Sequence, residues 1–313
     1  MFVAPAVRTE AFALWKLAWP ILIGQLASVG MSVADVAMAG HASAQDLAGV
    51  SLGVSIWFIV TVTLMGLLMA VNPVVSQHVG AGELPQIARV VRQALWKALG
   101  VSLVAWMLAN GAATVFAHLD IEPAVRALAR NFVFVISFSL PAFCCYRVLY
   151  GYSASLDQTK PMMAIALLAL ALNIAVNWML VFGRLGMPRL GGLGCAWATL
   201  CCTWFNLAAI VWWVRRAPAY RSTQPFTHYE WPHWHDIRIL LRLGLPIGVT
   251  YFAETSAFGL IALLVAGFGT VQVAAHQIAL NFTSLVFMVP MSLGLALLTR
   301  VGQALGAADP RAA

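Results

Sequence analysis

The fold is decided by stretches such as Ala164–Phe182, which reads AIALLALALNIAVNWMLVF. Asn173 and Asn177 are its only strongly polar residues, and none of its residues is charged. About 20 such residues form a helix that crosses ~30 Å of hydrocarbon. The apolar residues run on continuously and do not alternate with polar ones. The stretch therefore predicts a membrane-spanning helix and not a barrel strand.

The whole chain shares this apolar character. Of its 313 residues, 62% are hydrophobic and 9% are charged, whereas a soluble domain carries roughly 25% charged residues. Lipid offers no hydrogen-bond partners to the backbone, so only helices or closed barrels can span it. The composition therefore predicts an all-α integral membrane protein. The net charge of +7 does not require a nucleic-acid partner, because basic cytoplasmic loops give the same sum.

The same length criterion, applied along the chain, predicts about eight transmembrane helices. The connections are short except for a polar, aromatic and proline-containing segment, which we interpret as a linker between two bundles. We expect a six-helix N-terminal lobe at 1–216, a cytoplasmic linker at 217–238, and the first two helices of a C-terminal lobe at 239–313. The predicted helices cover residues 14–39, 47–71, 93–116, 131–155, 161–182, 192–214, 240–266 and 273–299.

The positions of the Lys and Arg residues predict the orientation. If the N-terminus is cytoplasmic, only the four arginines of segments 126–130 and 184–189 fall outside. The remaining fourteen of the 18 Lys and Arg residues, Lys97 and Arg147 among them, are then placed on or near the cytoplasmic side. This asymmetry follows the positive-inside rule and supports a cytoplasmic N-terminus.

An internal repeat becomes visible when the sequence is shifted by 226 residues. Leu14–Ile21 then lies over Leu240–Ile247, and both copies have a basic residue followed four positions later by proline. Ser76–Glu83 lies over Gly302–Asp309, and both copies contain Gln-x-x-Gly-Ala. Parallel repeats of this kind are typical of secondary transporters, with a substrate path between the halves. Because the second copy stops after two helices, we expect an incomplete C-terminal lobe.

Asp35 is one of two acidic residues that fall well inside the predicted spans. A carboxylate at the bilayer centre costs a few kcal/mol and usually faces a cavity or a partner. Gln25, Ser32 and Asp35 share one face of the first helix, as Asn173 and Asn177 share a face of the fifth. The amides could hydrogen-bond the carboxylate or join it in holding a cation. Interhelical hydrogen bonds without a transport role are the alternative.

Glu254 is the second such acidic residue, and it lies one turn from Tyr251 and Phe258. A carboxylate beside aromatic rings suits a lipophilic cation, although rings at this spacing also serve simple packing. Pro20 in the first helix is a candidate hinge, because proline frees a carbonyl and permits a bend. The chain shows no ATP-binding loop, catalytic triad or metal-ligand spacing, so we expect no enzyme activity, metal site or cofactor.

Several segments, in their order along the chain, resemble the multidrug and toxic compound extrusion (MATE) family, in its bacterial multidrug efflux branch. The resemblance covers almost the whole chain, as the first eight of twelve expected helices. No single segment decides it, but their order together with the repeat is specific. The segments are Leu17–Ile21, Ala34–Gly40, Gln77–Gly82, Asn173–Asn177, Gly192–Thr199 and Ala274–Ile278.

The resemblance implies a secondary active transporter that exports lipophilic organic cations in exchange for H⁺ or Na⁺, by alternating access between two six-helix lobes. It implies a monomer in the bacterial inner membrane, whose partners are the lipid bilayer and small cationic substrates. The same oxygen ligands serve H⁺ and Na⁺, so both ions stay open. The implied coupling residues are Asp35, Asn173, Asn177 and Thr199, and the implied substrate-path residues are Glu254, Gln25, Ser32, Tyr251 and Phe258.

Two alternatives stay open at this point. A lipid-linked precursor flippase of related fold would line its cavity with several Arg or Lys residues to meet phosphates, whereas the deep ionisable groups expected here are mainly acidic. An inactive truncated paralogue or membrane scaffold is favoured by the missing helices. The retained Asp35 group and Glu254 argue against it.

Overall fold

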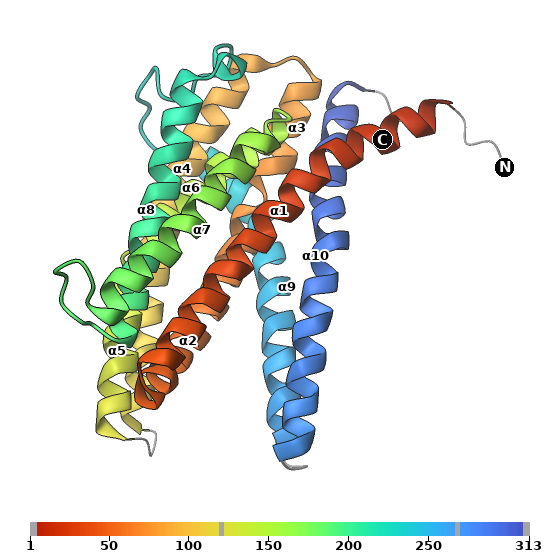
Figure 1. Ribbon diagram of the computed structural model, residues 1–313. Helices are drawn as coiled ribbons and strands as arrows, with labels where there is room; N and C mark the ends of the chain where they lie inside the picture. The colour runs from red at the N-terminus through yellow and green to blue at the C-terminus, as the bar shows by residue number, and fades with distance from the viewer. Residues whose placement is uncertain (1–4, 119–121, 267–269, 309–313) are drawn as a thin grey trace.

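The structure is a computed structural model, and it describes residues 5–118, 122–266 and 270–308. Within these ranges every regular element is a helix (Figure 1), as the composition predicts. The helices are α1 (Pro5–Ala42), α2 (Ala44–Leu68), α3 (Val71–Gly80), α4 (Leu84–Ala112), η1 (Ala113–His118), α5 (Pro123–Ser137), α6 (Leu140–Ser155), α7 (Thr159–Phe182), α8 (Gly192–Arg216), η2 (Pro218–Tyr220), α9 (Trp234–Ala266) and α10 (Thr270–Gly306).

Among the described residues, six stretches of helix are long and apolar enough to cross a membrane, and the bent pair α5–α6 provides a seventh. α2 joins α3 in one such stretch, and α4 joins η1 in another. α9 has 33 residues but carries Asp236, Arg238, Arg242 and Glu254, and it is not among the six. The fold is therefore all-α and membrane-spanning, with a helix count close to the eight expected.

Two of the predicted helices are broken in the structure. The helix expected at 131–155 consists of α5 and α6, which meet at an angle of 45°. Pro141 lies in the first turn of α6 and has no backbone N–H to continue the ladder. The Ser139 hydroxyl instead donates to the Ile136 carbonyl at 2.5 Å. Likewise, the helix expected to reach residue 71 ends at Leu68, and α3 begins at Val71.

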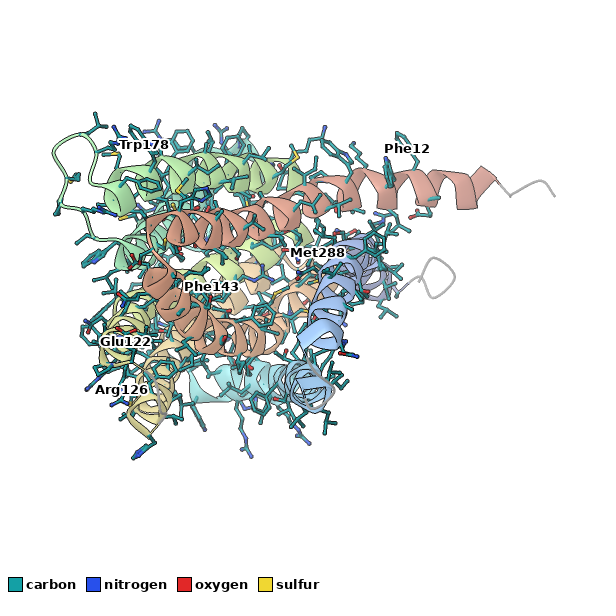
Figure 2. The ribbon with its side chains drawn as sticks, turned by 60° about the horizontal axis from the view of Figure 1, so that its bottom comes forward. Phe12, Glu122, Arg126, Phe143, Trp178 and Met288 are labelled. Atoms are coloured by element: carbon teal, nitrogen blue, oxygen red, sulfur yellow. The ribbon has the colours of Figure 1, made fainter. Side chains whose placement is uncertain are left out.

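The outer surface carries large apolar side chains. Phe12 on α1 and Trp178 on α7 are 70% and 44% exposed, and Figure 2 shows both on the outer side of their helices. In water such a surface would be unfavourable, because apolar area gains free energy when it leaves water. In a bilayer the same side chains lie against lipid tails.

Helices α9 and α10 lie side by side on one flank of the other helices (Figure 1). We call them the α9–α10 pair, and we call α1 to α8 the α1–α8 bundle. α9 packs along α2, and α10 packs along α1 and α3. The shift of 226 residues relates α1 to α9, and α2 with α3 to α10. The first helix of each repeat therefore packs against the second helical segment of the other repeat: α1 packs against α10, and α9 packs against α2.

The two repeats meet most closely where α3 crosses α10. A Cβ atom built on Gly80 would overlap the Gln303 carbonyl oxygen, and one built on Gly306 would overlap the Gln77 carbonyl oxygen. Gly80 and Gly306 are related by the 226-residue shift, and so are Gln77 and Gln303. The crossing is thus a symmetric contact between two backbones, and it exists because both positions lack a side chain.

Polar contacts beside this crossing tie α10 to the α1–α8 bundle. The Asn72 amide donates to the Thr299 hydroxyl at 3.0 Å, and both side chains are buried. The Gln303 amide donates to the Ser155 carbonyl at 3.0 Å and to the Asp157 carboxylate at 3.3 Å. The contact between Asn72 and Thr299 satisfies polar groups that would otherwise be buried without partners, which is costly. We call this region the α3–α10 end.

The crossing predicts opposite effects for one substitution at two helical glycines. Gly80→Ala should lower the Tm of the purified protein, because the added methyl forces α3 away from α10. Gly100→Ala on α4 meets no atom within 4 Å, and replacing an unhindered helical Gly by Ala stabilises by roughly 0.5–1 kcal/mol. Thermal unfolding in detergent checks both variants. Equal Tm values for the two would contradict the close approach.

The segment that joins α8 to α9 is held against α4. The Arg92 guanidinium pairs with the Glu230 carboxylate at 2.6 Å, and the Trp96 indole N–H donates to the Glu230 carbonyl at 2.9 Å. Gln93 donates to the Trp231 carbonyl at 3.1 Å. Helix α9 already begins at Trp234, so the last five residues of the expected 217–238 linker are helical.

The Arg92 hydrogen bond lowers the pKa of Glu230 below its ordinary value. A carboxylate with a lowered folded-state pKa stabilises the fold above its ordinary pKa, near 4.3, and this contribution is lost as the pH falls through the lowered value. We expect acid to release the segment between α8 and α9 from α4 in the wild type. A change in tryptophan fluorescence, to which Trp96 contributes, measures this release. Glu230→Gln should already be released at neutral pH and should lack this transition. The same acid transition in both proteins would exclude the pair as its cause.

Candidate functional site

Asp35 lies in the last third of α1, and its side chain is only 8% exposed. α1 packs along α7 over much of its length and also contacts α8. Asp35 faces these two helices, and Ala39, one turn further on, is fully buried on the same side. The carboxylate is therefore enclosed by protein and does not face lipid.

Three donors from two other helices converge on the carboxylate. On α7, the Asn177 amide donates to Asp35 Oδ1 at 2.5 Å and the Asn173 amide donates to the same oxygen at 3.2 Å. On α8, the Thr199 hydroxyl donates to Asp35 Oδ2 at 2.9 Å. Asn177 also donates to Asn173 Oδ1 at 3.1 Å. The four residues that the resemblance groups together are thus in direct contact.

No basic side chain balances the charge of this carboxylate in the described part of the chain. The four ion pairs found there involve other carboxylates, and the three donors to Asp35 are neutral. Asn177 Oδ1 is buried and has no hydrogen-bond partner among the described residues. The site therefore combines an ionisable group with an unused oxygen acceptor. A proton or a small cation would complete it.

The first turn of α8 is fixed by Asp46 at the start of α2. Asp46 accepts a hydrogen bond from the Gly192 backbone N–H at 2.8 Å and one from the Ser43 hydroxyl at 2.7 Å. Negative charge at a helix N-terminus is favourable because unpaired N–H groups gather there. Gly191 has a φ of 56° and approaches the carboxylate so closely that a side chain would clash. This anchor places α8, and with it Thr199, beside Asp35.

The other predicted residues on α1 lie apart from this site. Gln25 is partly buried and donates to the Met291 sulfur of α10 at 4.0 Å, so it faces the α9–α10 pair. Ser32 is exposed. Pro20 is buried inside α1, and the helix continues through it from Pro5 to Ala42. Gln25 and Asp35 were expected on one face of the first helix, but they meet different neighbours. Gln25 faces α10, and Asp35 faces α7 and α8.

The residues predicted on α9 are more exposed than the sequence suggested. Glu254 was expected to be a buried carboxylate, but its side chain is exposed, and Phe258 is 48% exposed. α9 packs on α2 through Gly244 and Gly248, and this face excludes Glu254. Tyr251 does reach α2, and its hydroxyl donates to the Met69 sulfur at 3.8 Å.

Two basic residues lie deeper than the charge count placed them. Lys97 on α4 is 2% exposed and donates to the Leu67 carbonyl at 3.2 Å, close to the break between α2 and α3. Arg147 lies at the middle of α6 and not at its end. The count placed both on or near the cytoplasmic side, because positive-inside statistics say nothing about which side chains enter the bundle. Asp46 was also missed, because it looked like an ordinary loop residue.

Comparisons with known proteins now identify the family. The MatE family model matches residues 20–179 and 246–313. The chain is 42% identical over 309 residues to the multidrug resistance protein PmpM of Pseudomonas aeruginosa. This chain belongs to the MATE family. It is also 41% identical over 308 residues to the probable multidrug resistance protein NorM of Chromobacterium violaceum.

Solved MATE structures share the fold. The eukaryotic MATE transporter AtDTX14 superposes with a TM-score of 0.88 at 19% sequence identity, covering 98% of this chain and 68% of that one. An outward-facing multidrug resistance MATE transporter gives 0.85, also at 19% identity, and covers 96% of this chain and 66% of that one. The alignment with PmpM covers 97% of this chain and 64% of PmpM. The alignment with the NorM protein covers 98% of this chain and 66% of that protein. The chain thus spans about two thirds of these MATE relatives.

The hydrogen bonds to Asp35 predict a non-additive effect on stability in this MATE chain. Asn177→Ala should lower the Tm, because a buried carboxylate that loses a donor costs roughly 1–3 kcal/mol. The same substitution should have a much smaller effect in an Asp35→Leu background, where no charge remains to be solvated. A double-mutant cycle on Tm values in detergent checks this coupling. Additive shifts would show that Asn177 stabilises the bundle independently of Asp35.

Proposed function

We propose that this chain serves in cation-coupled antiport, exporting lipophilic organic cations in exchange for H⁺ or Na⁺ through Asp35. The observation that carries the proposal is the enclosed carboxylate with three neutral donors from α7 and α8. A purely structural carboxylate is usually paired with a cation or coordinates a metal. Here the counter-charge has to come from outside the described residues.

The coupling ion would bind to oxygens that the site already presents. A proton would bind an Asp35 carboxylate oxygen, and the amides of Asn173 and Asn177 would keep the group oriented. A sodium ion would use the same carboxylate together with the unpartnered Asn177 Oδ1 and the Thr199 hydroxyl oxygen. Either ion would neutralise the charge of the carboxylate. Carboxylate and hydroxyl oxygens can serve either ion, so we propose the site and not the choice of ion.

α1 would carry the effect of ion binding to the α9–α10 pair. Its C-terminal part holds Asp35, while Leu17, Ala18 and Ile21 pack against Leu295 and Ala296 of α10. A ligand shifts a conformational equilibrium only when it binds the two states with different affinity. Neutralising Asp35 supplies such a difference, because the donors on α7 and α8 then hold α1 less strongly. Pro20 lies in the contact segment and is the proposed hinge.

Two further expectations belong to this proposal. The α1–α8 bundle and the α9–α10 pair would belong to two lobes that alternate access, with the α3–α10 end toward the cytoplasm of a bacterial cell and the protein in the inner membrane. Relatives named as multidrug resistance proteins support export as the direction of transport. The positive-inside distribution supports the orientation.

The decisive experiment measures accumulation of tetraphenylphosphonium in an efflux-deficient bacterium that expresses the chain. The wild-type chain should lower accumulation, and Asp35→Asn should abolish this effect at an unchanged protein level in the membrane, since the amide cannot change charge. Glu122→Gln is the matched control, because Glu122 is exposed, lies at the start of another helix far from Asp35 in the sequence, and accepts a hydrogen bond from the Gln45 amide.

A second matched pair separates the site from general helix damage. Thr199→Ala should weaken export, whereas Thr203→Ala, one turn along α8, should leave it unchanged, because the Thr203 hydroxyl donates to the Thr199 backbone carbonyl and not to Asp35. Normal export by Asp35→Asn would remove Asp35 from the mechanism. Accumulation unaffected by the wild-type chain would contradict transport by this chain.

A further inference from the structure

The loop between α7 and α8 projects sideways from the α1–α8 bundle (Figure 1). It covers residues 183–191 and joins the two helices that donate to Asp35. α7 begins beside the α3–α10 end, where Gln303 donates to Asp157, so the loop lies at the opposite end of this helix. A loop that leaves the side of a membrane bundle near a helix end meets lipid headgroups and the adjoining part of the acyl chains.

The two ends of this loop are held together by main-chain contacts. The Leu190 N–H donates to the Leu180 carbonyl at 2.9 Å. Gly183 approaches the main chain of Arg189 so closely that a side chain would clash. Arg184 follows Gly183 directly, so the side chains of Arg184 and Arg189 leave the backbone at neighbouring points. The loop therefore presents a fixed pair of basic residues at its base.

Leu185, at the tip of the loop, has a backbone conformation that leucine rarely adopts. Its φ is 55°, in the left-handed region where a bulky side chain crowds the main chain. Its side chain is nevertheless 78% exposed, and Met187 is 45% exposed. A loop tip in water would favour glycine or asparagine at such a φ. An apolar side chain that is held outward by a strained backbone indicates that the tip is surrounded by apolar material.

The base of the loop carries positive charge, and residues 183–191 include no acidic residue. Arg184 and Arg189 are exposed, and neither takes part in the four ion pairs found among the described residues. Asp46, which lies beside the end of the loop, already accepts hydrogen bonds at the start of α8. The Arg184 guanidinium lies over the Trp178 ring, with Cζ 5.7 Å from the centroid, and Trp178 stands on the outer side of α7 (Figure 2). Tryptophan and arginine together are typical of the membrane interface, and the free positive charge favours an anion there.

We propose that loop 183–191 is a binding site for an anionic phospholipid. The lipid phosphate pairs with Arg184 and Arg189, and the acyl chains pack against Leu185 and Trp178. A guanidinium binds phosphate through paired N–H···O bonds, and basic residues near a membrane surface attract anionic lipid. A zwitterionic lipid offers the same phosphate together with a cationic group, which the two arginines repel. The inference does not depend on the proposed transport function, because neither ion binding nor cargo binding enters it.

Native mass spectrometry of the purified full chain compares the retention of two lipids. Detergent micelles contain equal amounts of dioleoyl phosphatidylglycerol and dioleoyl phosphatidylcholine, which share their acyl chains and differ in headgroup charge. The wild type should retain more phosphatidylglycerol. Arg184→Gln and Arg189→Gln should each lower the ratio of bound phosphatidylglycerol to phosphatidylcholine about fivefold, the effect of one basic residue near an anionic surface. The matched control is Arg130→Gln, which should leave the ratio unchanged, because Arg130 is an exposed arginine of α5 outside the loop.

Leu185→Gly separates lipid binding from folding of the loop. Glycine adopts a φ of 55° without strain, so the Tm of this variant in lipid-free detergent should not fall. Its retention of both lipids should fall, because the apolar contact with the acyl chains is lost. A lower Tm together with unchanged lipid retention would show that Leu185 stabilises the protein itself, and would overturn the site.

Three further outcomes would also contradict the lipid site. Equal retention of the two lipids by the wild type would show that the arginines do not select charge. An equal fall of the ratio in Arg130→Gln and Arg184→Gln would show a general attraction to the basic surface. Displacement of phosphatidylglycerol by soluble glycerol phosphate would identify a phosphate site that needs no acyl chains. None of these results bears on export of tetraphenylphosphonium, so the lipid site and the transport function can fail separately.

Discussion

A single carboxylate placed among apolar helices constrains much of this structure. An ionised group taken out of water has to be solvated by the protein. Asp35 is solvated by amides one turn apart on α7 and by a hydroxyl on α8. Those two helices therefore have to sit at a fixed distance and rotation relative to α1. The Asp46 anchor at the start of α8, about two turns before Thr199, serves the same requirement.

Much of the Asp35 site could be predicted from the sequence, because it depends on local spacing. Asn173 and Asn177 share a helix face by their separation alone, and an acidic residue in an apolar run requires polar neighbours. The pairing of Thr199 with Asp35 depends on how α8 packs, and only the family resemblance indicated it. The exposure of Glu254 likewise depends on which face of α9 meets α2, and the α9 sequence does not reveal that.

The misplaced boundaries have a common physical origin. Hydropathy changes little across Ser137–Leu140, so the apolar run hides the break between α5 and α6, which is made by a proline and a hydroxyl. The charge count placed Arg147 on or near the cytoplasmic side, because a charge is cheaper outside the hydrocarbon. Its place inside the bundle reflects the Tyr150 ring and a pocket beside α10, which belong to the folded protein. Hydropathy and charge statistics describe the average position of a residue type. They do not show where a particular side chain lies in the folded protein.

The crossing of α3 and α10 has a mechanical consequence. Where side chains interlock, two helices can turn against each other only if many rotamers change together. At Gly80 and Gly306 the main chain of one helix contacts the main chain of the other. At this point, therefore, no side chain has to change its rotamer when one helix tilts against the other. Because the 226-residue shift exchanges the two glycines and the two glutamines, each repeat contributes the same kind of backbone contact to this joint.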